Sequence, residues 1–213
     1  AHFAWVKARA GLGREAKADL ARVGLQKASA STLSFGALTL QRLGRKKELA
    51  AVVRRLLGLV GARVETGEED QDYAPGQVLY ALALTAGRTA PVDDALGYYR
   101  RRFRARPQWG SVAWLTMAFA AWSRVKRDGA LLDFAWEIAR WALQAQAPHG
   151  GFWNDHQPDA PGALTAVYLE GLAALLPELR RDRRTASAAR LARALDQGFE
   201  FLGQLTYQPG DAA

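Results

Sequence analysis

WALQAQAPHGGFWNDHQPDAPGALTAVYLEGL, residues 141–172, is the stretch that decides the fold. Its first part has the apolar spacing of a helix that ends near Gln146, and the same spacing resumes from Ala163. The loop between these two parts is rich in Gly, Pro, His, Trp and Asp, and Gly, Pro and Asp in particular interrupt helices and favour turns. The stretch therefore predicts a helix, a long loop and a second helix.

The rest of the chain repeats this pattern. Apolar residues recur at three- and four-residue intervals, alternating strand-like segments are missing, and helix hairpins begin near residues 32, 75, 111 and 163. The first helix of each pair is nearly free of charge, whereas the second is amphipathic, as a covered inner layer and a solvent-exposed outer layer require. The prediction is an all-α fold, a partial or complete α/α toroid of antiparallel helical hairpins.

We interpret residues 1–213 as a single all-α domain. Residues 1–30 are expected to form one or two N-terminal helices, broken near Gly11, and residues 31–213 to form the hairpin repeats. A hydrophobic fraction of 49% is enough to build a core and argues against disorder. Charges or glycines interrupt each apolar run, so no membrane span is expected.

The chain has no cysteine, which excludes disulfides, thiolate metal ligands and cysteine nucleophiles. It also has no phosphate-binding glycine loop, serine nucleophile elbow or zinc motif. His149, Asp155 and His156 do not have the spacing of metal ligands. Neither a metal nor another cofactor is expected.

A ring of hairpins has all its tight turns at one end and all its connecting loops at the other. Basic residues gather in the predicted turns: Arg42, Arg45, Lys46, Lys47, Arg88, Lys126, Arg127, Arg180, Arg181, Arg183 and Arg184. Acidic and aromatic residues gather in the connecting loops: Glu65, Glu68, Glu69, Asp70, Asp72, Tyr73, Trp109, His149, Trp153, Asp155 and His156. Since long loops on a rigid scaffold often carry function, we expect the ligand cleft at the acidic, aromatic end.

Three side chains are candidates for a catalytic acid or base. Glu170 falls early in a predicted inner helix, where a carboxylate either faces the centre of the ring or pairs with an arginine. Asp155 and His156 follow Trp153 in the long loop, as an acid/base pair beside a stacking ring or as ordinary loop residues. Six further side chains are candidates for ligand contact: Trp109, Trp153, Tyr168, Asp72, Tyr73 and Gln77.

Two resemblances to known families accompany this pattern. The spacing of Trp141, Gln146, Gly151 and Trp153 resembles the glutamine–tryptophan repeat of the terpenoid cyclases, in which the glutamine caps a helix end and the tryptophan stacks on it. Three other segments are similar to bacterial α/α-toroid proteins of the sugar-epimerase and glycosidase type: DYAPGQVLYALAL (72–84), VYLEGL (167–172) and GFEFLGQLTY (198–207). Complete six-hairpin rings of that type are longer than this chain, which implies a partial ring or a piece of a longer protein.

Two functions are consistent with these features. The first is a carbohydrate-active or carbohydrate-binding domain, with an oligosaccharide or another polyhydroxylated ligand at the acidic, aromatic end. If it is an enzyme, acid/base chemistry on a sugar is expected, as in an epimerase, a lyase or a glycoside hydrolase. The alternative is a non-catalytic helical scaffold that binds a protein or a polyanion through the basic turn end, consistent with the net charge of +8.

Overall fold

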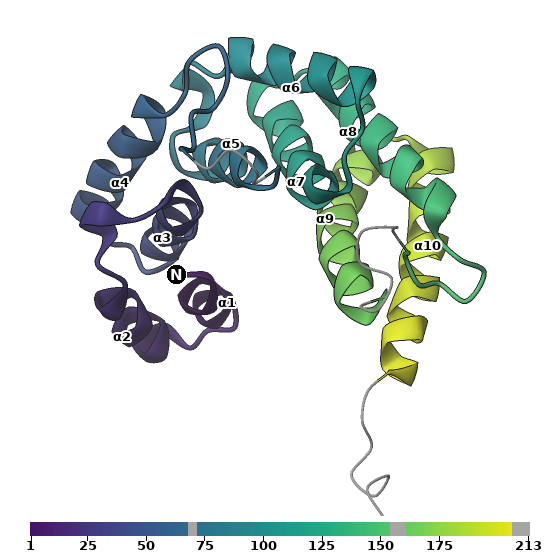
Figure 1. Ribbon diagram of the computed structural model, residues 1–213, viewed down its shortest axis with the longest axis horizontal. Coiled ribbons are helices and arrows are strands. Elements are labelled where there is room, and N and C mark those ends of the chain that lie inside the picture. Colours follow the sequence, from purple (N-terminus) through teal and green to yellow (C-terminus); the bar gives the residue numbers. More distant parts are fainter. Residues whose placement is uncertain (68–71, 154–160, 206–213) are drawn as a thin grey trace, which may run out of the picture.

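The computed structural model describes residues 1–67, 72–153 and 161–205, and within them the chain is all-α. Ten α-helices form antiparallel pairs, arranged as an arc with an inner and an outer layer (Figure 1). The inner helices are α1 (His2–Arg9), α3 (Ala30–Arg42), α5 (Ala74–Thr85), α7 (Trp109–Lys126) and α9 (Pro161–Arg181). The outer helices are α2 (Gly13–Val23), α4 (Lys46–Gly58), α6 (Asp93–Ala105), α8 (Gly129–Ala142) and α10 (Thr185–Gln204).

Each inner helix packs against the next one along the arc, and this continuous contact forms the core. The centre of the core is α7, in which every residue from 111 to 123 is buried. Glycines allow two of these contacts to be very close: a Cβ built on Gly171 of α9 would lie 2.4 Å from Cα of Ala113, and one on Gly76 of α5 would lie 2.7 Å from Cβ of Trp114. Trp122 of α7 also donates its indole N–H to the carbonyl of Leu79, at 2.8 Å.

The outer helices are amphipathic, as their sequences predict. The outer helix α4 buries Val52 and Leu56, and α6 buries Tyr99 and Phe103 among its larger side chains. Their opposite faces carry charged residues that reach solvent. This difference between the layers follows directly from the distribution of charge along the chain.

All five turns that join an inner helix to its outer partner contain a residue in the left-handed region of the backbone. These residues, in chain order, are Gly11, Gly44, Gly87, Arg127 and Arg183. Glycine adopts this conformation at no steric cost, whereas a residue with a Cβ does not. The last two hairpins therefore use arginine where the first three use glycine.

The hairpins begin within a few residues of the predicted positions. Helix α9 is unusual, because it continues through Pro177 to Arg181. A proline inside a helix removes one hydrogen bond. Extensive packing of α9 against α7 and α10 holds the helix together.

The N-terminal segment adopts the same arrangement as the rest. Helices α1 and α2 form an antiparallel hairpin, and α1 packs against α3 in the inner layer (Figure 1). Ser29 caps α3 by accepting a hydrogen bond from the backbone N–H of Thr32 at 3.3 Å.

By length and composition, α9 reaches the threshold for a membrane-spanning helix. The segment Gly162–Arg181 has a mean hydropathy of 1.3, although Glu170 and Gly171 interrupt its apolar run. Forty-four per cent of this segment is buried, and α9 packs against α7 and α10 as a core helix does.

The linkers between hairpins meet at one end of the arc, as predicted. Arg102 of α6 donates hydrogen bonds to Asp72 of the α4–α5 linker and to Gln108 of the α6–α7 linker, both at 3.2 Å. On the other side of α7, Phe152 of the α8–α9 linker lies 5.5 Å from the ring of Tyr168. The turns between partner helices lie at the opposite end.

Candidate functional site

A cavity of about 370 Å³ lies at the linker end of the inner layer. All five inner helices contribute to its lining, which places it on the concave side of the arc. Its larger side chains come from His2, Phe35, Tyr73, Gln77, Trp109, Trp114, Leu164, Val167, Tyr168 and Glu170. We call it the aromatic cavity, because six of these ten side chains carry aromatic rings.

The rings around the aromatic cavity hold one another in place. Phe35 is the hub: its ring centre lies 4.7 Å from that of His2 and 5.4 Å from those of Trp5 and Trp114. The contact with Trp114 is edge-to-face, a favourable arrangement for two aromatic quadrupoles. These contacts join α1, α3 and α7, so the wall of the cavity is preformed.

One residue of this lining carries a buried polar atom without a hydrogen-bond partner. Gln77 of α5 is only 5% exposed, and its amide oxygen Oε1 accepts no hydrogen bond from any described residue. Leaving a buried acceptor unpaired costs about 1–3 kcal/mol. The rest of the Gln77 side chain lines the aromatic cavity.

Among the described residues, Glu170 is the one carboxylate that lines the aromatic cavity. Its Oε1 lies 3.7 Å from Nη1 of Arg9, which brings together the first and the last inner helix. Both side chains are more than a third exposed, so the pair contributes little to stability. The carboxylate remains accessible to a ligand.

A row of rings connects the cavity to the outer layer. Trp109 lies 4.4 Å from Trp141 of α8 and 5.3 Å from Tyr168 of α9, measured between ring centres. Tyr168 in turn contacts Phe152. The backbone N–H of Phe152 donates to the hydroxyl oxygen of Thr165 at 2.8 Å, which fixes the start of this row.

The first half of the α8–α9 linker is attached to α10. Gln146 donates from Nε2 to the carbonyls of Gly150 (2.9 Å) and Ala194 (2.8 Å). Trp153 is 45% exposed; its ring lies 6.4 Å from that of His149 and does not line the aromatic cavity. Asp155 and His156 lie outside the described residues.

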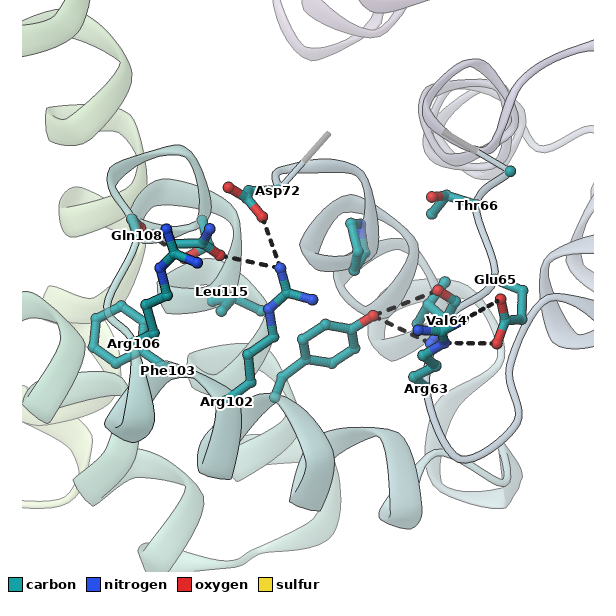
Figure 2. A pocket seen from close by; sticks show the side chains of 14 residues that line it. Arg63, Val64, Glu65, Thr66, Asp72, Arg102, Phe103, Arg106, Gln108 and Leu115 are labelled. Atoms are coloured by element: carbon teal, nitrogen blue, oxygen red, sulfur yellow. Dashed lines mark hydrogen bonds and ion pairs between the residues drawn. The ribbon is translucent and has the colours of Figure 1, made fainter. Parts of the chain in front are cut away.

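Asp72 lines a different cavity, of about 380 Å³, between the α4–α5 linker and α6 (Figure 2). Figure 2 shows Arg102 extended towards Asp72, and Arg63 paired with Glu65 at 2.8 Å. The acidic side chains described in this linker therefore have arginine partners. The linker end is not a uniformly acidic surface in the part of the chain that the structure describes.

Two neighbouring tyrosines on α6 have opposite environments. Burial raises the pKa of Tyr99 to about 12, and its hydroxyl accepts a hydrogen bond from the backbone N–H of Val64 at 3.2 Å. The hydrogen bond from Arg102 lowers the pKa of Tyr98, which is near the surface. Tyr99 thus secures the linker to α6.

Many of the basic residues at the turn end are also paired. Lys126 lies 2.9 Å from Asp93, and Arg184 lies 2.7 Å from Asp182. Arg45 forms an ion pair with Glu48. Within the described residues, no group of three or more His, Asp or Glu side chains is arranged to hold a metal ion.

The structure thus brings together five of the nine predicted site residues around the aromatic cavity: Tyr73, Gln77, Trp109, Tyr168 and Glu170. It places Asp72 and Trp153 elsewhere. Sequence reasoning missed His2, Trp5 and Arg9, whose spacing of three and then four residues puts them on one face of α1. That spacing is the signal that could have identified them.

Comparison with protein-family models, with curated proteins and with solved structures gives no match to this chain.

Proposed function

We propose that the chain is a partial α/α toroid that binds a short saccharide, or a similar polyhydroxylated ring, in the aromatic cavity. The observation that supports this proposal is the combination of aromatic walls with the unpaired amide oxygen of Gln77. A sugar ring presents C–H groups on its faces, which pack against aromatic rings, and hydroxyl groups on its rim, which need polar partners. Both requirements are met in one place.

The dimensions and the polar groups agree with this ligand class. A volume of about 370 Å³ lies in the range of roughly 300–1,000 Å³ that is usual for small-molecule sites. Gln77 places a polar amide in the lining of the cavity, and Glu170 accepts a ligand hydroxyl at its border. Trp109, Trp114 and Tyr168 supply the stacking surface.

The proposal concerns binding rather than glycoside hydrolysis. Hydrolysis of a glycosidic bond ordinarily requires two carboxyl groups on either side of that bond. Glu170 is the one carboxylate that the described residues place at the aromatic cavity. Its role in the bound state is therefore to accept hydrogen bonds.

Calorimetric titration with neutral mono- and disaccharides at fixed ionic strength tests the proposal. We expect saturable binding by the wild type, at least tenfold weaker binding by Gln77→Leu and by Glu170→Gln, and unchanged binding by Arg190→Gln on the exposed face of α10. Trp109 and Trp114 make tryptophan fluorescence a second measurement. The proposal fails if no saccharide binds, or if Gln77→Leu binds as tightly as the wild type.

A further inference from the structure

A second cavity, of about 640 Å³, lies on the concave face nearer the turn end. It is lined by residues of α1, α5, α7 and α9, and it meets the aromatic cavity at Glu170, which borders both. Its polar lining consists of Arg9, Tyr80, Arg124, Glu170, Glu178 and Arg181. We call it the arginine cavity. With three guanidinium groups and two carboxylates, its lining is electropositive.

Two of the three guanidinium groups have unused donors. Nη1 of Arg9 lies 3.7 Å from Glu170, and Nη1 of Arg124 lies 3.8 Å from Glu178, distances too long for hydrogen bonds. Neither side chain donates a hydrogen bond to any described residue. Arg181 differs, because it donates from Nη2 to Glu178 at 3.0 Å.

The guanidinium group of Arg9 is held in position by an aromatic ring. Its Cζ lies 4.9 Å from the ring centre of Trp5, one turn earlier on α1. Such a cation–π contact orients the planar group and leaves its edge N–H donors free. Arg9 is therefore arranged to bind a further partner.

Tyr80 of α5 adds a third donor. Its hydroxyl has no hydrogen-bond partner among the described residues, and burial raises its pKa, so it stays protonated at neutral pH. Arg9 and Arg124 both act electrostatically on this hydroxyl to lower its pKa, and Glu170 acts to raise it. The three donors line the same cavity and come from three inner helices, α1, α5 and α7.

We propose that Arg9, Tyr80 and Arg124 form a binding site for the oxyanion group of a small molecule, either a carboxylate or a phosphate. A guanidinium group presents paired N–H donors that match two oxygens of such a group. The buried carboxylate of Glu178 keeps Arg181 in place beside the site. The three donors are not among the residues proposed to bind the saccharide, although Glu170 borders both cavities.

Titration followed by NMR, with inorganic phosphate and separately with acetate, tests this site at a constant ionic strength set with chloride. We expect saturable shifts for at least one of the two anions. Arg124→Gln should weaken that binding at least tenfold and Tyr80→Phe at least threefold, and Arg190→Gln on α10 is the matched control. Thermal unfolding verifies that each variant is folded.

Three outcomes would overturn the proposal. One is the absence of saturable binding for both anions. Another is an equal loss of binding in Arg190→Gln and Arg124→Gln, which would indicate attraction by the overall charge. The third is binding that Arg124→Gln and Tyr80→Phe leave unchanged. The relative affinity for phosphate and acetate identifies which oxyanion the site prefers.

Discussion

Arg9 on the first inner helix and Glu170 on the last lie 3.7 Å apart, so an ion pair connects the two ends of the inner layer. Since both side chains are more than a third exposed, we expect Glu170→Gln to change the free energy of unfolding by less than about 1 kcal/mol. Urea denaturation measures this difference. A larger loss would show that the pair closes the arc, and Arg9→Gln should then produce the same loss.

The close contact between α9 and α7 makes Gly171 irreplaceable. The added Cβ in Gly171→Ala would lie 2.4 Å from Cα of Ala113, and backbone cannot move away as a flexible side chain can. We expect destabilisation of about 3 kcal/mol or more, measured by chemical denaturation. The control is Gly203→Ala in α10, where nothing lies within 4 Å and alanine should be neutral or stabilise by up to about 1 kcal/mol. Similar effects at both positions would refute this packing.

Arg127 terminates α7 with φ at 56°. Because an L-residue with a Cβ pays about 1–2 kcal/mol for this conformation, Arg127→Gly should raise the free energy of unfolding by about 0.5–1 kcal/mol. Arg127→Lys keeps the Cβ and should not stabilise. Equal stability of the glycine and lysine variants in a urea titration would contradict the assigned strain.

Tyr99 should make stability sensitive to alkaline pH. Its pKa is about 12 in the folded chain and about 10 in the unfolded chain, so its contribution is complete below pH 10 and is lost as the pH rises towards 12. This pKa difference corresponds to a change of roughly 2–3 kcal/mol in the free energy of unfolding. Tyr99→Phe should lose stability at neutral pH and show a smaller further loss between pH 10 and 12. If the free energy of unfolding of the wild type and of Tyr99→Phe falls equally between pH 10 and 12, Tyr99 is not the group responsible.

Gln77 presents a conflict between stability and binding. Gln77→Leu replaces an unpaired buried amide by an apolar group of similar size, so we expect the ligand-free protein to gain about 1 kcal/mol in unfolding free energy. Thermal denaturation without ligand measures the change. Destabilisation by this substitution would mean that the amide contributes to the fold itself.

The layered fold could be predicted from the sequence because charge is distributed unevenly between alternate helices. The uncharged segment VAWLTMAFAAW (112–122) is the buried helix α7, and the segments rich in arginine are outer helices. The extension of α9 beyond Pro177 could not be predicted, since it depends on packing against helices distant in the chain.

The candidate site was only partly predictable, because it too depends on contacts between segments that are distant in the chain. Tyr73, Gln77 and Trp109 lie at or near helix starts next to linkers, so a ring of hairpins places them at one end. The pairing of Asp72 with Arg102 joins two segments whose sequence spacing carries no sign of their contact. Local spacing identifies faces of helices, whereas partners across the arc require coordinates.

The attachment of Gln146 to Ala194, together with the packing of Gly150 against Gln197, has a consequence for cooperativity. A Cβ on Gly150 would lie 2.1 Å from the carbonyl oxygen of Gln197, so linker and helix are in direct backbone contact. Neither can unfold locally without exposing the other. We therefore expect residues 143–153 and α10 to unfold as a single unit, so that this loop-like segment shares the free energy of opening of a helix.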